Sequence, residues 1–113
     1  MITSEEILND KLIKRMIRHK NLKKDTIDTY RIVFAEYCNL LNKTPSELIK
    51  EAKEEKRTIL YDYERSINDH IDEYYDYLQN KDLMNSTRAL KMHVLIAFYN
   101  FYKTDPPESP KFQ

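Results

Sequence analysis

The chain has 113 residues, no glycine and one cysteine, and its 19 basic side chains balance 19 acidic ones. Glycine supplies the positive φ angles of hairpin turns and phosphate-binding loops, so its absence argues against a β-rich domain, a Walker loop and a dinucleotide-binding fingerprint. The charge balance excludes a global field that would recruit nucleic acid or membrane, and a single cysteine excludes a disulfide framework and a cysteine-based zinc site. The length fits one domain.

Apolar residues at steps of three and four predict helices along most of the chain. No useful alternation of apolar and polar residues predicts a β-strand. The last helix is apolar most of the way round and is therefore expected to be buried on most sides. The fold class predicted is all-α, a compact bundle of four to five helices without a β-sheet. The five expected helices cover residues 4–19, 25–42, 45–56, 60–78 and 85–102.

Capping signals mark three of the expected helix starts. Thr44 and Glu47 have the spacing of a capping box around a proline at the first helical position, which is the best local signal in the sequence. Ser4 is the expected N-cap of the first helix, and Asn85 or Ser86 is the expected N-cap of the last. Three prolines after residue 104 end the last helix and predict an extended linker.

The residue types that carry catalysis do not gather in a recognisable pattern. The histidines at 19, 70 and 93 lie on three different expected helices without metal-ligand spacing. Cys38 lies on the apolar stripe of its helix and is expected to be a small buried residue. The acidic face of the fourth helix is expected to be solvated rather than catalytic. The sequence therefore predicts no enzyme activity of this chain alone, no metal site and no cofactor.

Charge is unevenly distributed along the chain. Residues 1–24 hold seven basic and three acidic side chains, a net charge of +4, whereas residues 45–82 have a net charge of −5. One interpretation is a polyanion-binding face, and the other is a scattered, solvated surface.

Two expected helix starts, residues 22–30 and 83–90, share one layout of an apolar residue, polar capping residues and a threonine near the first turn. Free N–H groups at a helix start suit phosphate oxygens, although both segments could be ordinary capped helices. The candidate DNA-binding residues are Lys23, Lys24, Thr26, Thr29, Arg31, Asn85, Ser86, Thr87, Arg88 and Lys91.

The succession of motifs resembles a known family. Its parts are Thr26-Ile27-x-x-Tyr30, the segment Lys-Thr-Pro-Ser-Glu-Leu-Ile-Lys-Glu-Ala at 43–52, an acidic amphipathic helix, and Ser86-Thr87-Arg88 followed by Phe-Tyr-x-Phe-Tyr at 98–102. This order is similar to the N-terminal core-binding (SAM-like) domain of tyrosine recombinases, closest to archaeal phage-type integrases. The resemblance covers residues 20–107, about three quarters of the chain, and no single motif in it is specific.

The resemblance implies that the chain binds double-stranded DNA as one half of a clamp in DNA integration and recombination. The partners implied are duplex DNA and further recombinase protomers in a synaptic complex, while the isolated domain is expected to be monomeric. The catalytic half, with its arginines, histidine and tyrosine nucleophile, is not in this chain. Asp25 departs from the family pattern, since a basic or neutral residue often stands there.

The expected division of the chain is an N-terminal basic helix over 1–20, a core-binding domain over 21–104, and a proline-rich linker over 105–113 toward a catalytic domain. With no hydrophobic signal core and no apolar run of membrane-spanning length, the protein is expected to be cytoplasmic. The alternative function is a helical protein–protein interaction module, in which the last helix exposes Phe98, Tyr99 and Tyr102 to a partner.

Overall fold

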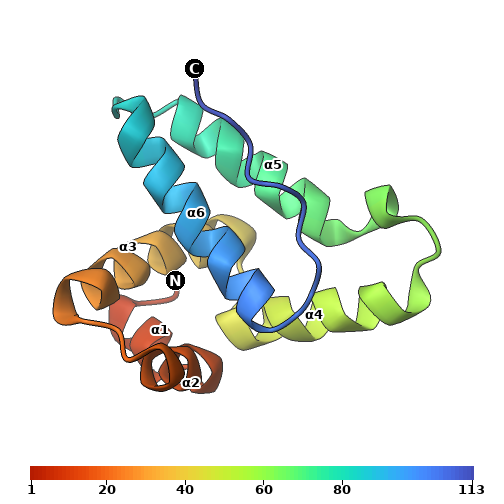
Figure 1. Ribbon diagram of the computed structural model, residues 1–113, viewed down its shortest axis with the longest axis horizontal. Coiled ribbons are helices and arrows are strands. Elements are labelled where there is room, and N and C mark those ends of the chain that lie inside the picture. The colour runs from red at the N-terminus through yellow and green to blue at the C-terminus, as the bar shows by residue number, and fades with distance from the viewer. The chain divides into compact units, whose positions relative to one another are not determined.

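The computed structural model describes residues 1–113 and contains no β-strand, which confirms the all-α prediction. It divides into two compact units, residues 1–50 and residues 51–113. The α-helices are α1 (Ser4–Asn9), α2 (Lys11–Lys20), α3 (Lys24–Leu41), α4 (Pro45–Thr58), α5 (Ser66–Gln79) and α6 (Asn85–Phe101), and a short 3-10 helix, η1, covers Asp62–Glu64 (Figure 1).

The prediction of a single helix over 4–19 is wrong, because the helix is interrupted at Asp10. The backbone of Asp10 is extended (φ −62°, ψ 133°), and its side chain accepts the Leu12 N–H at 2.9 Å as the N-cap of α2. The same carboxylate accepts the N–H and the hydroxyl of Ser46 at 3.1 and 2.8 Å. These hydrogen bonds attach the α1–α2 junction to the start of α4 within the first unit, and they explain why the helix is interrupted there.

The capping box predicted at the start of α4 is confirmed. The Thr44 N–H donates to Glu47 Oε1 at 2.9 Å, and the Glu47 N–H donates to Thr44 Oγ1 at 3.2 Å. The hydrogen bond from the Thr44 N–H, followed by an effect of the Thr44 side chain, favours the ionised carboxyl group and lowers the pKa of Glu47. At α1 the prediction is wrong by one residue, since Thr3 rather than Ser4 accepts the first-turn N–H group.

Asparagine replaces glycine where two helices end. Asn21 after α2 and Asn42 after α3 have left-handed backbones, with φ of 49° and 55°, a conformation that asparagine tolerates better than most residues. Asn39 has a different role. Its side-chain amide accepts a hydrogen bond from the Ile2 N–H and donates one to the Ile2 carbonyl, which holds the N-terminal residues against α3. The buried apolar residues of this unit on α1 to α3 are Ile7, Ile13, Met16, Tyr30, Val33, Phe34, Tyr37 and Cys38.

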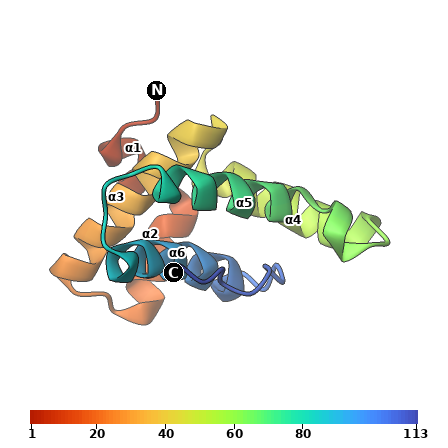
Figure 2. The ribbon, with the colours of Figure 1, turned by 90° about the horizontal axis from the view of Figure 1, so that it is seen from above.

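The fourth helix, predicted from residue 60, begins only at Ser66. The Glu55 carboxylate on α4 accepts both the N–H and the hydroxyl of Ser66 at 3.0 Å, which sets the start of α5. Residues 59–65 instead form the turn between α4 and α5, seen at the right of Figure 2. Leu60 and Tyr63, expected on the apolar stripe, are 82% and 75% exposed, so this part of the prediction is wrong.

The C-terminal segment, predicted to be an extended linker, has no regular structure but lies against α5 (Figure 1). Arg65 is buried and donates to the carbonyl oxygens of Ala52, Thr104 and Asp105. Further along, the ring of Phe112 stacks on Tyr75 with 4.8 Å between centroids. The buried apolar side chains that α5 and α6 contribute to the second unit are Ile67, Ile71, Tyr74, Leu78, Met92, Val94, Leu95, Ile96, Phe98 and Tyr99.

Candidate nucleic-acid interface

The start of α3 exposes three of its five predicted contact residues. Lys23 occupies the N-cap position with an extended backbone and makes no side-chain capping hydrogen bond. Lys24 and Thr26 follow in the first turn and are exposed. Asp25, between them, is exposed as well and does not cap the helix. Two cations and a hydroxyl therefore surround backbone N–H groups that donate no hydrogen bond to a side chain.

The other two predicted residues of this helix are engaged within α3 itself. Thr29 is half-buried, and its hydroxyl donates to the Asp25 carbonyl at 3.2 Å. Arg31 forms an ion pair with Asp28 at 3.4 Å, one turn away. To contact DNA, Thr29 or Arg31 would have to give up these interactions within α3. The accessible part of the candidate site is therefore the first turn of α3.

At the start of α6, Arg88 has a structural role that the sequence did not suggest. Its guanidinium donates to the carbonyls of Leu78 at 2.9 Å and Lys81 at 2.7 Å, and more weakly to Gln79 at 3.5 Å. These groups lie at and just after the C-terminus of α5, where helix carbonyls lack partners within the helix. Arg88 is half-buried rather than exposed as expected, because it stabilises the α5–α6 connection.

The remaining predicted residues of α6 are divided between open and engaged positions. Ser86 is exposed, whereas Thr87 and Lys91 are half-buried. Asn85 is exposed, but its Oδ1 accepts a hydrogen bond from Arg88 at 2.8 Å. Neither Asn85 nor Ser86 is the N-cap, a position that Met84 occupies without a side-chain hydrogen bond. The capping expectation for α6 is therefore wrong.

The starts of α3 and α6 differ from those of the other four α-helices. Thr3 and Asp10 cap α1 and α2, Thr44 caps α4, and the Glu55 carboxylate accepts the Ser66 N–H at the start of α5. No side chain accepts the first-turn N–H groups of α3 or α6. Unpaired N–H groups at the positive end of a helix dipole suit a phosphate oxygen.

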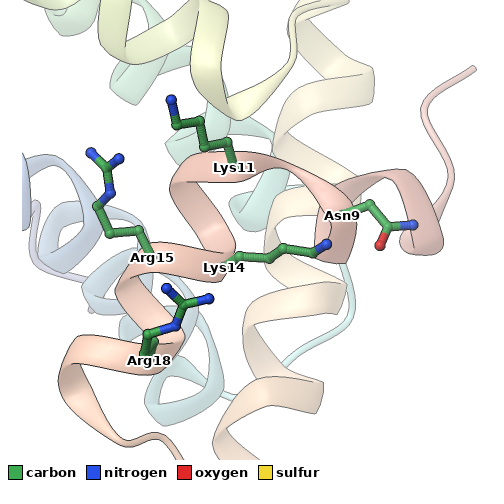
Figure 3. Close-up of a pocket in the computed structure, with 5 residues that line it drawn as sticks. All are labelled: Asn9, Lys11, Lys14, Arg15 and Arg18. Atoms are coloured by element: carbon green, nitrogen blue, oxygen red, sulfur yellow. The ribbon is translucent and has the colours of Figure 1, made fainter.

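A strongly basic surface on α2 was not among the predicted site residues. Five residues line a hollow of about 330 Å³ on the first unit, and Figure 3 shows the four basic side chains projecting from α2 and Asn9 at the end of α1. They are Asn9, Lys11, Lys14, Arg15 and Arg18. The signal that could have revealed this surface is the absence of any acidic residue over residues 11–20, with cations at steps of three and four.

Two residues considered for catalysis or metal binding, Cys38 and His70, are buried or hydrogen-bonded. Cys38 is fully buried, as expected, and burial, with smaller effects of the Asp10 and Glu47 charges, raises the pKa of its thiol to about 12. Such a thiol is a poor nucleophile at neutral pH. His70 donates to or accepts from Glu51 at 2.7 Å, and no group of three or more His, Cys, Asp or Glu side chains is placed to share a metal ion.

The aromatic surface required by the alternative function is not present. Phe98 and Tyr99 are fully buried and Tyr102 is 9% exposed, with the ring of Phe98 edge-on to both tyrosines. The expectation that α6 offers these three rings to a partner is therefore wrong. They pack within the protein because α6 is apolar on most of its circumference.

Comparison of the chain with protein-family models, with curated proteins and with solved structures gives no match. None of the helices combines the length and the apolar content that crossing a bilayer requires.

Proposed function

We propose that this chain binds double-stranded DNA as the core-binding half of a site-specific tyrosine recombinase. The observation that carries the proposal is the contrast among helix starts. The two starts proposed to contact DNA, those of α3 and α6, are the ones whose first-turn N–H groups have no side-chain acceptor. At α3, exposed Lys23 and Lys24 add positive charge beside these groups.

The contact at α3 is tested by two neighbouring substitutions with opposite expected effects. Lys24→Gln removes a cation and is expected to weaken binding to a short duplex by about two- to fivefold, the range of one exposed ion pair. Asp25→Asn removes a carboxylate that repels phosphate and is expected to tighten binding by a similar factor. Fluorescence anisotropy titration at low salt measures both.

Asp72→Asn is the matched control, because Asp72 is an exposed carboxylate on α5 in the second unit. If Asp72→Asn and Asp25→Asn tighten binding equally, the effect is one of total charge and the α3 contact is wrong. If the wild-type protein does not bind duplex DNA at low salt, the proposed function is wrong.

The recombinase part of the proposal has a separate test in the gene. The coding sequence is expected to continue past Gln113 through about 170–200 residues, the size of one further domain. That region is expected to encode an arginine, a His-x-x-Arg motif and a late tyrosine. A stop codon directly after Gln113 would contradict the recombinase part of the proposal and leave the DNA-binding part untouched.

A further inference from the structure

We infer that the outer face of α2 is a second phosphate-contacting surface for duplex DNA, distinct from the two helix starts; this inference rests on the proposed function. Its four cations, Lys11, Lys14, Arg15 and Arg18, are all exposed, and none of them takes part in a salt bridge. With no acidic side chain on α2 to neutralise them, their charge is available to an anionic partner.

The positions of two of these cations cannot be explained by helix stability. Basic residues stabilise the C-terminal end of a helix dipole, which accounts for Arg18 in the last turn of α2. Lys11 and Lys14 stand at the opposite, positive end, where a cation is unfavourable and an acidic residue is preferred. Two cations placed against the dipole, on the same face as Arg15 and Arg18, favour binding of an anion over a purely structural role.

The dimensions of the face suit a nucleic-acid backbone. Lys11 and Arg18 are seven residues apart, which corresponds to about 10 Å along the helix axis. One strand of duplex DNA carries a phosphate every 3.4 Å of its axis, so a span of about 10 Å can face about three phosphates. Arg15 and Arg18 add the planar guanidinium groups that bind phosphate through two hydrogen bonds.

A membrane surface fits this helix less well, although α2 has the basic and apolar faces of an interfacial helix. Such a helix inserts its apolar face between lipid head groups. In this protein Ile13 and Met16, on the apolar face of α2, are 0% exposed because they belong to the core. Only the charged face of α2 is free, and charge alone favours a dense linear polyanion.

The test compares two double variants with identical chemistry. Lys14→Gln with Arg18→Gln removes two cations four residues apart on α2, and Lys53→Gln with Arg57→Gln removes two exposed cations with the same spacing on α4. Duplex affinity is measured by anisotropy over a range of salt concentrations. The α2 pair is expected to reduce the magnitude of the negative slope of log K against log salt by about two, one unit per lost phosphate contact. The α4 pair is expected to leave the slope unchanged.

Three outcomes overturn the inference. If the α2 pair keeps the wild-type slope while Lys24→Gln weakens binding, the α2 surface is wrong and the proposed function stands. If both double variants reduce the magnitude of the slope equally, the effect is nonspecific. If the α2 pair binds DNA normally but loses binding to phosphatidylserine vesicles, the partner of α2 is a membrane. Urea unfolding of each variant confirms that the fold is retained.

Discussion

Cys38 illustrates how a single side chain takes its chemistry from its surroundings. The thiol lies on the core-facing side of α3 and is fully buried. Burial opposes formation of the thiolate, and the negative charges of Asp10 and Glu47 oppose it further, so that the pKa rises from its usual 9.0 to about 12. The residue therefore contributes packing and no nucleophile.

The raised pKa predicts a loss of stability in alkali. Between pH 9 and pH 12 the unfolded chain releases the thiol proton while the folded protein retains it, so the free energy of unfolding falls as the pH rises. The expected slope from this group is about 1.4 kcal/mol per pH unit. Urea unfolding of the wild type and of Cys38→Ala at pH 8 to 10.5 isolates the contribution of the thiol, since the variant has no thiol to titrate. Parallel curves for the two proteins would contradict the prediction.

Among the elements, the junction of α1 and α2 depends on one carboxylate. Asp10 accepts the N–H of Leu12 and two hydrogen bonds from Ser46, at the start of α4. A residue that caps one helix and attaches it to another contributes more than a cap alone, because its removal leaves three donors without their acceptor.

Asp10→Ala is expected to lower the free energy of unfolding by about 2 kcal/mol, combining a lost N-cap with two lost hydrogen bonds. Glu5→Ala, at an exposed position on α1, is the control and is expected to change stability by less than about 0.5 kcal/mol. Urea denaturation monitored by circular dichroism measures both. Equal effects of the two substitutions would show that the Asp10 hydrogen bonds contribute nothing net.

For the whole molecule, zero net charge conceals a separation of charge along the chain. Residues 1–24 carry +4 and residues 45–82 carry −5, so binding to a polyanion is a property of particular surfaces and not of the overall field. With about four to six phosphate contacts, the slope of log K against log salt is expected near −4 to −5. Anisotropy titrations between about 50 and 200 mM salt measure this slope, and a slope near zero would contradict electrostatic binding.

The start of α4 was predicted correctly because it is specified by neighbouring residues. The capping box of Thr44 and Glu47 formed as predicted, since all its groups lie within four residues. The helix predicted from residue 60 was wrong because its start depends on Glu55, a residue outside its own apolar pattern. Arg88 was assigned to DNA for a similar reason, since the carbonyls that it meets belong to the end of another helix.

The sequence by itself determined the helical class, the apolar stripes and the concentration of basic residues near the N-terminus. Periodicity, propensity and charge are properties of short stretches of chain, so they can be read without knowing the partners of each residue. Only the tertiary structure decided which polar groups remain available, because a hydrogen bond between distant segments has no local signature. By that criterion it removed Arg88 from the open surface, buried the aromatic face of α6, and left Lys11, Lys14, Arg15 and Arg18 on α2 without salt-bridge partners.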